Sequence, residues 1–218
     1  INISAGKNLV GAFYNPKGVI IDTSVLETLP NREFKSGLAE VIKYSLIENK
    51  YLFSILMSQS EKILSMEHNV IQELIHRSIQ TKARIVTKDE RENGIRAILN
   101  FGHTFGHAIE AHGGFKKILH GEAIAKGMKI ASKISHLENL ITEKDYKKII
   151  NLLKLYEFDL SLEQYKYHEL KPYIFRDKKV KAGKLNLVLL KKISEAIVTS
   201  SFDQRNLQKG LQTKSKQH

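Results

Sequence analysis

Residues 99–123 read LNFGHTFGHAIEAHGGFKKILHGEA and contain four of the nine histidines of the chain, at positions His103, His107, His112 and His120. If the segment is helical, His103, His107 and Glu110 lie at i, i+4 and i+7, so their side chains share one face. Two neutral imidazoles and a carboxylate on one face can hold zinc. A single histidine is more often a surface or hydrogen-bonded residue, but this clustering favours a metal site.

The HTFGH sequence has the spacing of the zincin motif, in which two helical histidines bind zinc and a glutamate between them acts as general base. Thr104 stands where that glutamate is required. The substitution removes the base and argues against a metalloprotease.

Further polar residues lie in otherwise apolar helical patterns. His120 and Glu122 add an imidazole and a carboxylate, and the segment GLAEVIKY places Glu40 and Lys43 one turn apart. Taken alone, Glu40 and Lys43 would be an ordinary i, i+3 surface pair. Together with the histidine cluster, they are candidates for the same site.

Apolar residues recur at helical spacing through most of the chain. The pattern predicts helices over 33–49, 50–65, 68–89, 120–137 and 142–156, the last with Thr142 as its capping residue. The sequence contains no internal repeat of fixed period and no low-complexity segment. The middle of the chain is therefore expected to be a helical domain.

Three short segments have strand-like sequences: 18–26 (GVIIDTSVL), 185–190 (LNLVLL) and 195–200 (EAIVTS). The last two predict a small C-terminal β hairpin. The predicted fold class is mainly α: a helical metal-binding domain with a short N-terminal β segment and this hairpin.

Composition limits the partners and the chemistry. Lys and Arg number 35 against 23 Asp and Glu, a net charge of +12, which favours anionic partners. No sequence signature of a nucleic-acid-binding motif accompanies this charge, and no apolar run reaches membrane-spanning length, so we expect neither nucleic acid nor membrane as partner. The absence of cysteine excludes disulfides, thiolate metal sites and a cysteine nucleophile.

Five blocks in order resemble the 3-dehydroquinate synthase family of sugar-phosphate cyclases, from Gly6 to about Leu190. They are GKNLVGAFYNPKGVIID, TLPNREFKSGLAEVIKYSLI, TKARIVTKDERENGIRAILNFGHTFGHAIE, HGEAIAKGM and DKKVKAGKLNLVLL. The resemblance implies a cytoplasmic, homodimeric, NAD- and metal-dependent lyase of the shikimate pathway. It would convert 3-deoxy-arabino-heptulosonate 7-phosphate to 3-dehydroquinate and phosphate.

The resemblance also assigns roles to single residues. It implies that Glu40, His103 and His120 bind Zn²⁺ or Co²⁺, so that His107 is not a ligand. His107 would instead move a proton beside the leaving phosphate. Glu92 corresponds to a proton acceptor, and Lys43 would contact substrate hydroxyls near the metal.

The phosphate and carboxylate of the substrate need basic and amide partners. The matching positions for substrate binding are Asn8, Lys82, Arg96, Asn100 and Lys178. The positions that the resemblance puts beside NAD are Lys7, Val25, Leu26, Glu27 and Thr28.

The family has an N-terminal α/β domain whose glycine-rich turns bind the dinucleotide. We expect residues 1–30 to be the end of that domain, residues 31–218 to be the helical metal- and substrate-binding domain, and the main NAD-binding half to lie upstream of Ile1. The chain alone is then expected to be inactive.

Three other interpretations remain open at this point. Another sugar-phosphate cyclase, such as 2-deoxy-scyllo-inosose synthase, would share the same blocks. A metal-dependent polyol dehydrogenase has a similar helical domain but typically has Asp at the position of Glu40 and lacks the DKK block. A basic helical domain that binds nucleic acid is supported by the charge alone.

Overall fold

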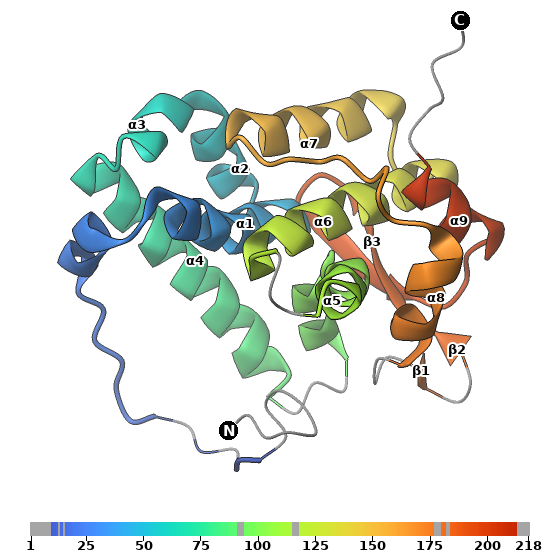
Figure 1. The fold of residues 1–218 in the computed structure, drawn as a ribbon. Coiled ribbons are helices and arrows are strands. Elements are labelled where there is room, and N and C mark those ends of the chain that lie inside the picture. The colour runs from blue at the N-terminus through green and yellow to red at the C-terminus, as the bar shows by residue number, and fades with distance from the viewer. Residues whose placement is uncertain are drawn as a thin grey trace, which may run out of the picture.

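The computed structural model describes residues 10–12, 14, 16–90, 94–114, 118–176, 180–181 and 184–212. Helices dominate these residues (Figure 1). The α-helices are α1 (Asn31–Ile47), α2 (Lys50–Ser58), α3 (Ser60–Leu64), α4 (His68–Lys88), α5 (His103–His112), α6 (His120–Leu137), α7 (Glu143–Leu155), α8 (Tyr167–Arg176) and α9 (Arg205–Leu211).

Helix α6 is the centre of the packing. It contacts α1, α5, α7 and α9, and it also contacts strand β3 (Leu187–Lys192). Figure 1 shows α6 in yellow-green between α1 and the red C-terminal elements. Ile124, Met128 and Ile134 of α6 are completely buried. Burial of this apolar surface is the main stabilising contribution to the fold.

Most of the helices predicted from periodicity are confirmed. Helices α1, α4, α6 and α7 match the predicted segments, and the Thr142 side chain accepts a hydrogen bond from the Asp145 N–H at 3.1 Å, as a capping residue should. The predicted helix 50–65 is instead two helices, α2 and α3, that meet at Gln59.

The predicted C-terminal hairpin is also confirmed. Strand β3 pairs antiparallel with β4 (Glu195–Thr199), with Val188 opposite Val198. The turn between them rests on the end of α1, because Ser194 donates hydrogen bonds to the carbonyl oxygens of Leu46 and Ser45 at 2.9 and 2.8 Å. A second pair consists of β1 (Val180–Lys181) and β2 (Lys184–Leu185).

The predicted N-terminal β segment is wrong. Residues 18–22 have no regular structure, and η1 (Thr23–Thr28) is a 3-10 helix that begins where Asp22 accepts a hydrogen bond from the Ser24 N–H at 2.9 Å. A strand needs a neighbouring strand to satisfy its backbone groups. No described strand lies beside this segment, and Ile20 is 97% exposed.

No described helix is long and apolar enough to cross a membrane.

Candidate metal centre

Three helices each bring one potential ligand to the same point. Glu40 lies on α1, and His103 and His120 are the first residues of α5 and α6. Oε1 of Glu40 is 3.4 Å from Nε2 of His103 and 3.5 Å from Nε2 of His120. The three potential ligand atoms lie within 4.8 Å of one another, a spacing that one metal ion can bridge.

Close backbone contacts bring the three helices together. A Cβ atom on Gly121 would lie 1.9 Å from the carbonyl oxygen of Ser36, so only glycine allows α6 to approach α1 this closely. A Cβ atom on Gly127 would lie 2.0 Å from the carbonyl oxygen of Gly102, so only glycine allows α6 to approach the start of α5 this closely. These two glycines therefore set the separation of the ligand-bearing helices.

A hydrogen bond fixes the proton of His103. Its Nδ1 lies 3.1 Å from the carbonyl oxygen of Phe101. Because a carbonyl oxygen only accepts, Nδ1 carries the proton. Burial lowers the pKa of His103 and so favours the neutral ring, and Nε2 is the nitrogen that faces Glu40.

His120 contacts carboxylates through both nitrogens. Its Nδ1 lies 3.1 Å from Oε2 of Glu110, and its Nε2 faces Glu40. The hydrogen bond with Glu110 and then the nearby carboxylate of Glu40 raise the pKa of His120 to about 9. A metal ion at Nε2 would replace the proton that this nitrogen holds at neutral pH.

The charge and hydrogen bonding of Glu40 indicate whether the site can hold a cation. Burial alone would raise its pKa, but His103, His120 and Lys43 outweigh that effect and hold the pKa well below its usual range, so the carboxylate is ionised. Oε2 accepts a hydrogen bond from Lys43 at 2.5 Å, whereas the buried Oε1 has no hydrogen-bond partner among the described residues. A buried anionic oxygen that faces two imidazole nitrogens fits a divalent cation such as zinc or cobalt.

The trio suggested by spacing alone does not form one site. Residues seven apart on a helix are separated by about 10 Å along its axis. His103 therefore groups with Glu40 and His120, while Glu110 groups with His107 and His120. The hypothesis that His103, His107 and Glu110 share one ion is wrong.

His107 lies beside the candidate ligands, one turn after His103. Its ring centroid is 5.2 Å from that of His103 and 5.9 Å from that of His120. The residue is exposed, unlike its neighbours on α5. His107 is therefore open to a solvent-borne substrate.

Lys43 is not a surface residue. It is 4% exposed, and burial lowers the pKa of its ammonium group while Glu40 partly offsets that effect. The interpretation of Glu40 and Lys43 as an ordinary surface pair is therefore wrong. The positive charge of Lys82 on α4 also lowers the pKa of Lys43.

The remaining predicted substrate and cofactor residues lie in two 3-10 helices or outside the described residues. Arg96 and Asn100 belong to η2 (Ile95–Asn100), where the Arg96 side chain donates to the carbonyl oxygen of Glu90. Residues 25–28 lie in η1, where Val25 is exposed and Leu26 packs against the core. The predicted residues that lie outside the described part are Lys7, Asn8, Glu92 and Lys178.

Arg32 is a residue that sequence reasoning missed. Its guanidinium donates to both oxygens of Glu122 at 2.6 and 2.8 Å, and Glu122 also accepts the backbone N–H of Leu119 at 2.9 Å. These bonds fix the start of α6, where His120 lies. Glu122, as an acidic residue in the first turn of α6, could have been recognised from the sequence as a capping residue. Nothing in the sequence identified Arg32 as its partner.

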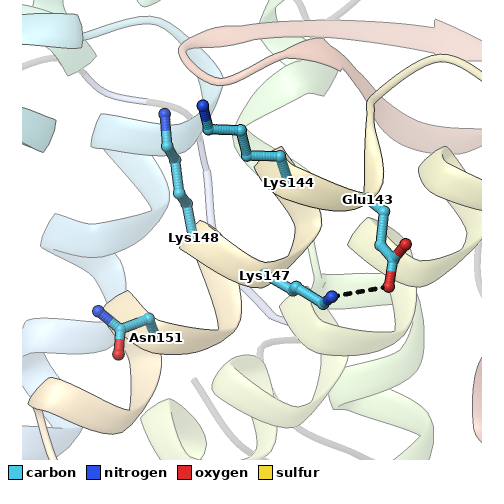
Figure 2. A pocket seen from close by; sticks show the side chains of 5 residues that line it. All are labelled: Glu143, Lys144, Lys147, Lys148 and Asn151. Carbon is cyan, nitrogen blue, oxygen red and sulfur yellow. Dashed lines mark ion pairs between the residues drawn. The ribbon is translucent and has the colours of Figure 1, made fainter.

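A separate hollow of about 530 Å³ lies along α7. Figure 2 shows its lining, with Lys147 directed at Glu143 and with Lys144 and Lys148 extending from the same helix. The Lys147 ammonium group and the Glu143 carboxylate are 2.9 Å apart. None of the histidines of the candidate metal centre lines this hollow.

Solved structures of sugar cyclases have the same fold. The 2-epi-5-epi-valiolone synthase of Streptomyces hygroscopicus subsp. jinggangensis, with NAD⁺ and Zn²⁺ bound, matches with a TM-score of 0.86 at 22% identity, over 97% of this chain and 59% of that one. A 2-deoxy-scyllo-inosose synthase complexed with carbaglucose-6-phosphate, NAD⁺ and Co²⁺ matches with a TM-score of 0.78 at 28% identity, over 97% and 60% of the two chains. The fold is that of the cyclases.

Sequence comparison narrows the class. Residues 37–180 match the family described as 3-dehydroquinate synthase C-terminal, and residues 1–36 match its N-terminal counterpart. The chain belongs to the 3-dehydroquinate synthase family.

Curated relatives agree with this assignment. The 3-dehydroquinate synthase of Dictyoglomus thermophilum is 44% identical over 211 residues, which are 97% of this chain and 59% of that protein. The enzyme of Prochlorococcus marinus strain MIT 9515 is 48% identical over 197 residues, 89% and 54% of the two chains. The chain thus spans somewhat more than half the length of these relatives.

Proposed function

We propose that this chain carries the metal- and substrate-binding part of a 3-dehydroquinate synthase, an NAD- and metal-dependent lyase. The reaction converts 3-deoxy-arabino-heptulosonate 7-phosphate to 3-dehydroquinate and phosphate. Curated relatives that are 42–48% identical and named 3-dehydroquinate synthase support this activity.

One observation carries the proposal. The Oε1 atom of Glu40 is buried, has no hydrogen-bond partner in the described part of the chain, and faces the Nε2 atoms of His103 and His120 at 3.4 and 3.5 Å. We assign these three residues as the metal ligands. Three protein ligands leave a coordination position open for substrate, as catalytic zinc sites do.

When bound, the metal would act as a Lewis acid on a substrate hydroxyl, and NAD would serve as hydride acceptor and later as donor. The residues of the chain position the substrate and move protons. Lys43, a buried cation beside Glu40, would donate hydrogen bonds to the substrate hydroxyls. His107, exposed beside the ligands, would exchange a proton with the leaving phosphate.

We extend the proposal to the remaining predicted residues. Substrate phosphate and carboxylate would be bound by Asn8, Lys82, Arg96, Asn100 and Lys178, with Glu92 as proton acceptor. NAD would contact Lys7 and residues 25–28. Residues 1–30 would complete an N-terminal NAD-binding domain, and residues 31–218 would form the metal-binding domain.

We also propose a cytoplasmic homodimer that uses zinc or cobalt. The absence of cysteine suits a reducing compartment. Imidazole and carboxylate ligands suit both metals. The two solved cyclases described above contain Zn²⁺ and Co²⁺, respectively.

The alternative is another sugar cyclase activity. The solved cyclases with other products are 22–28% identical to this chain, well below the relatives named 3-dehydroquinate synthase. The difference favours the 3-dehydroquinate product.

The test is a product assay on the full polypeptide that contains these residues. The enzyme is incubated with NAD, zinc and 3-deoxy-arabino-heptulosonate 7-phosphate, and phosphate and the carbocyclic product are followed together. We expect equal amounts of both and no net NADH. Accumulation of NADH without phosphate would identify a dehydrogenase and overturn the proposal.

A further inference from the structure

We propose that Glu110 is a positioning residue for the metal centre, which fixes the ring of His120 so that its Nε2 faces Glu40. The inference rests on the metal site of the proposed function and adds a residue outside the ligand set. Glu110 is 7% exposed and lies on α5, whereas His120 begins α6.

The two nitrogens of His120 contact two different carboxylates. Nδ1 is 3.1 Å from Oε2 of Glu110, and Nε2 is 3.5 Å from Oε1 of Glu40. An ionised carboxylate only accepts hydrogen bonds, so the contact with Glu110 keeps the proton on Nδ1. Nε2 is then the nitrogen that is available to a metal.

His120 needs this support more than His103 does. The side chain of His103 is 12% exposed and is held by a backbone carbonyl, that of Phe101. The side chain of His120 is 41% exposed. Rotation of its ring is therefore limited less by packing and more by the hydrogen bond to Glu110.

The second effect of Glu110 is electronic. A carboxylate that accepts the outer N–H of a metal-binding imidazole makes the ligating nitrogen more basic. Loss of such an outer partner typically weakens metal binding by about 10–100-fold. Without Glu110, the arrangement of the ligands around the bound ion should also differ from that in the wild type.

The experiment compares Glu110→Leu with Glu110→Gln. Leucine removes the acceptor, whereas glutamine keeps a carbonyl oxygen that can accept from Nδ1. Glu138, a partly buried carboxylate that accepts from Asn206 Nδ2 at 2.7 Å, provides matched controls in Glu138→Leu and Glu138→Gln. Zinc and cobalt affinities are measured by competition with a chelator, and the cobalt absorption spectrum is recorded.

We expect Glu110→Leu to lower the affinity for zinc and for cobalt by about 10–100-fold and to change the cobalt absorption spectrum. Glu110→Gln should restore most of the affinity and the wild-type spectrum, and both Glu138 variants should match wild type. Unchanged affinity and spectrum in Glu110→Leu would overturn the inference. So would complete loss of metal in both Glu110 variants together with retention in His103→Ala, because Glu110 would then be a ligand itself.

A measurement on the wild type covers the case in which Glu110→Leu does not fold. In the zinc-loaded protein, ¹⁵N–¹H spectra should show His120 protonated at Nδ1. A proton at Nε2 would overturn the inference. Wild-type protein that binds no zinc would overturn both the metal site and the role of Glu110, whereas inactivity with metal bound would contradict the proposed reaction alone.

Discussion

Gly121 and Ser36 are in backbone contact, and the Gly121 N–H donates to Oγ of Ser36 at 3.0 Å. Ser36 lies one helical turn before Glu40, and Gly121 directly follows His120. The contact between α1 and α6 therefore determines how far apart two candidate ligands lie.

Gly121→Ala should push these helices apart. The added methyl group overlaps the Ser36 carbonyl, so we expect a loss of about 1–3 kcal/mol in the free energy of unfolding and weaker zinc binding. The control is Gly37→Ala, because a Cβ atom there meets nothing within 4 Å and alanine favours the helix. Urea denaturation measures both variants. Equal stability of the two would contradict the role of the close contact.

Glu40→Gln should lower the affinity for zinc by more than about 100-fold, which exceeds the usual effect of replacing a residue that contacts only a ligand. The substitution removes the anionic oxygen that faces both imidazoles. Glu48→Gln is the matched control, because Glu48 follows α1 and pairs with Arg84 at 2.9 Å, away from the histidines. Metal content is determined by elemental analysis. Stoichiometric zinc in Glu40→Gln would remove Glu40 from the ligand set.

His107→Ala should retain the metal but slow turnover of the full polypeptide by about 100-fold or more, as expected when a general acid or base is lost. His112→Ala on the same helix is the control, since His112 faces Glu169 of α8 at 3.8 Å. If His107→Ala loses zinc and His103→Ala keeps it, the two histidines have exchanged roles.

Asp159→Asn should change how stability depends on pH. Lys126, which is buried, donates to Asp159 at 2.8 Å and holds the pKa of that carboxyl below its usual value of 3.8. A lowered pKa stabilises the folded state fully above the unfolded pKa, and this contribution is lost as pH falls through the folded pKa. The stability difference between wild type and Asp159→Asn should therefore be largest at about pH 7 and shrink toward about pH 3. A difference that does not vary with pH would refute the coupling.

Local patterns predicted most of the fold. Helical spacing located α4 and α7, because each of these helices buries one face. The short apolar segments 185–190 and 195–200 located β3 and β4, and four successive residues of β3 are buried. The pattern did not predict α8, which contains Pro172, a residue that normally disfavours a helix interior. It also assigned a strand to residues 18–26, where no described neighbour completes a sheet.

Such local patterns predicted less of the candidate site. Spacing grouped His103 with His107 and Glu110. The residue pattern made Glu40 a candidate for the same site, but only the family resemblance implied that it is a metal ligand. The pairing of Arg32 with Glu122 depends on how α1 packs on α6, and the burial of Lys43 depends on the elements that pack against α1. Contacts between distant segments leave little trace in one sequence.

The three candidate ligands come from α1, α5 and α6, so they converge only after these helices have packed. The unfolded chain then has far lower affinity for the ion than the native chain. Free zinc at about 100 times its dissociation constant would raise the free energy of unfolding by about 2.7 kcal/mol. Because proteases degrade the unfolded fraction, the zinc supply of the cell would help to set the lifetime of the polypeptide.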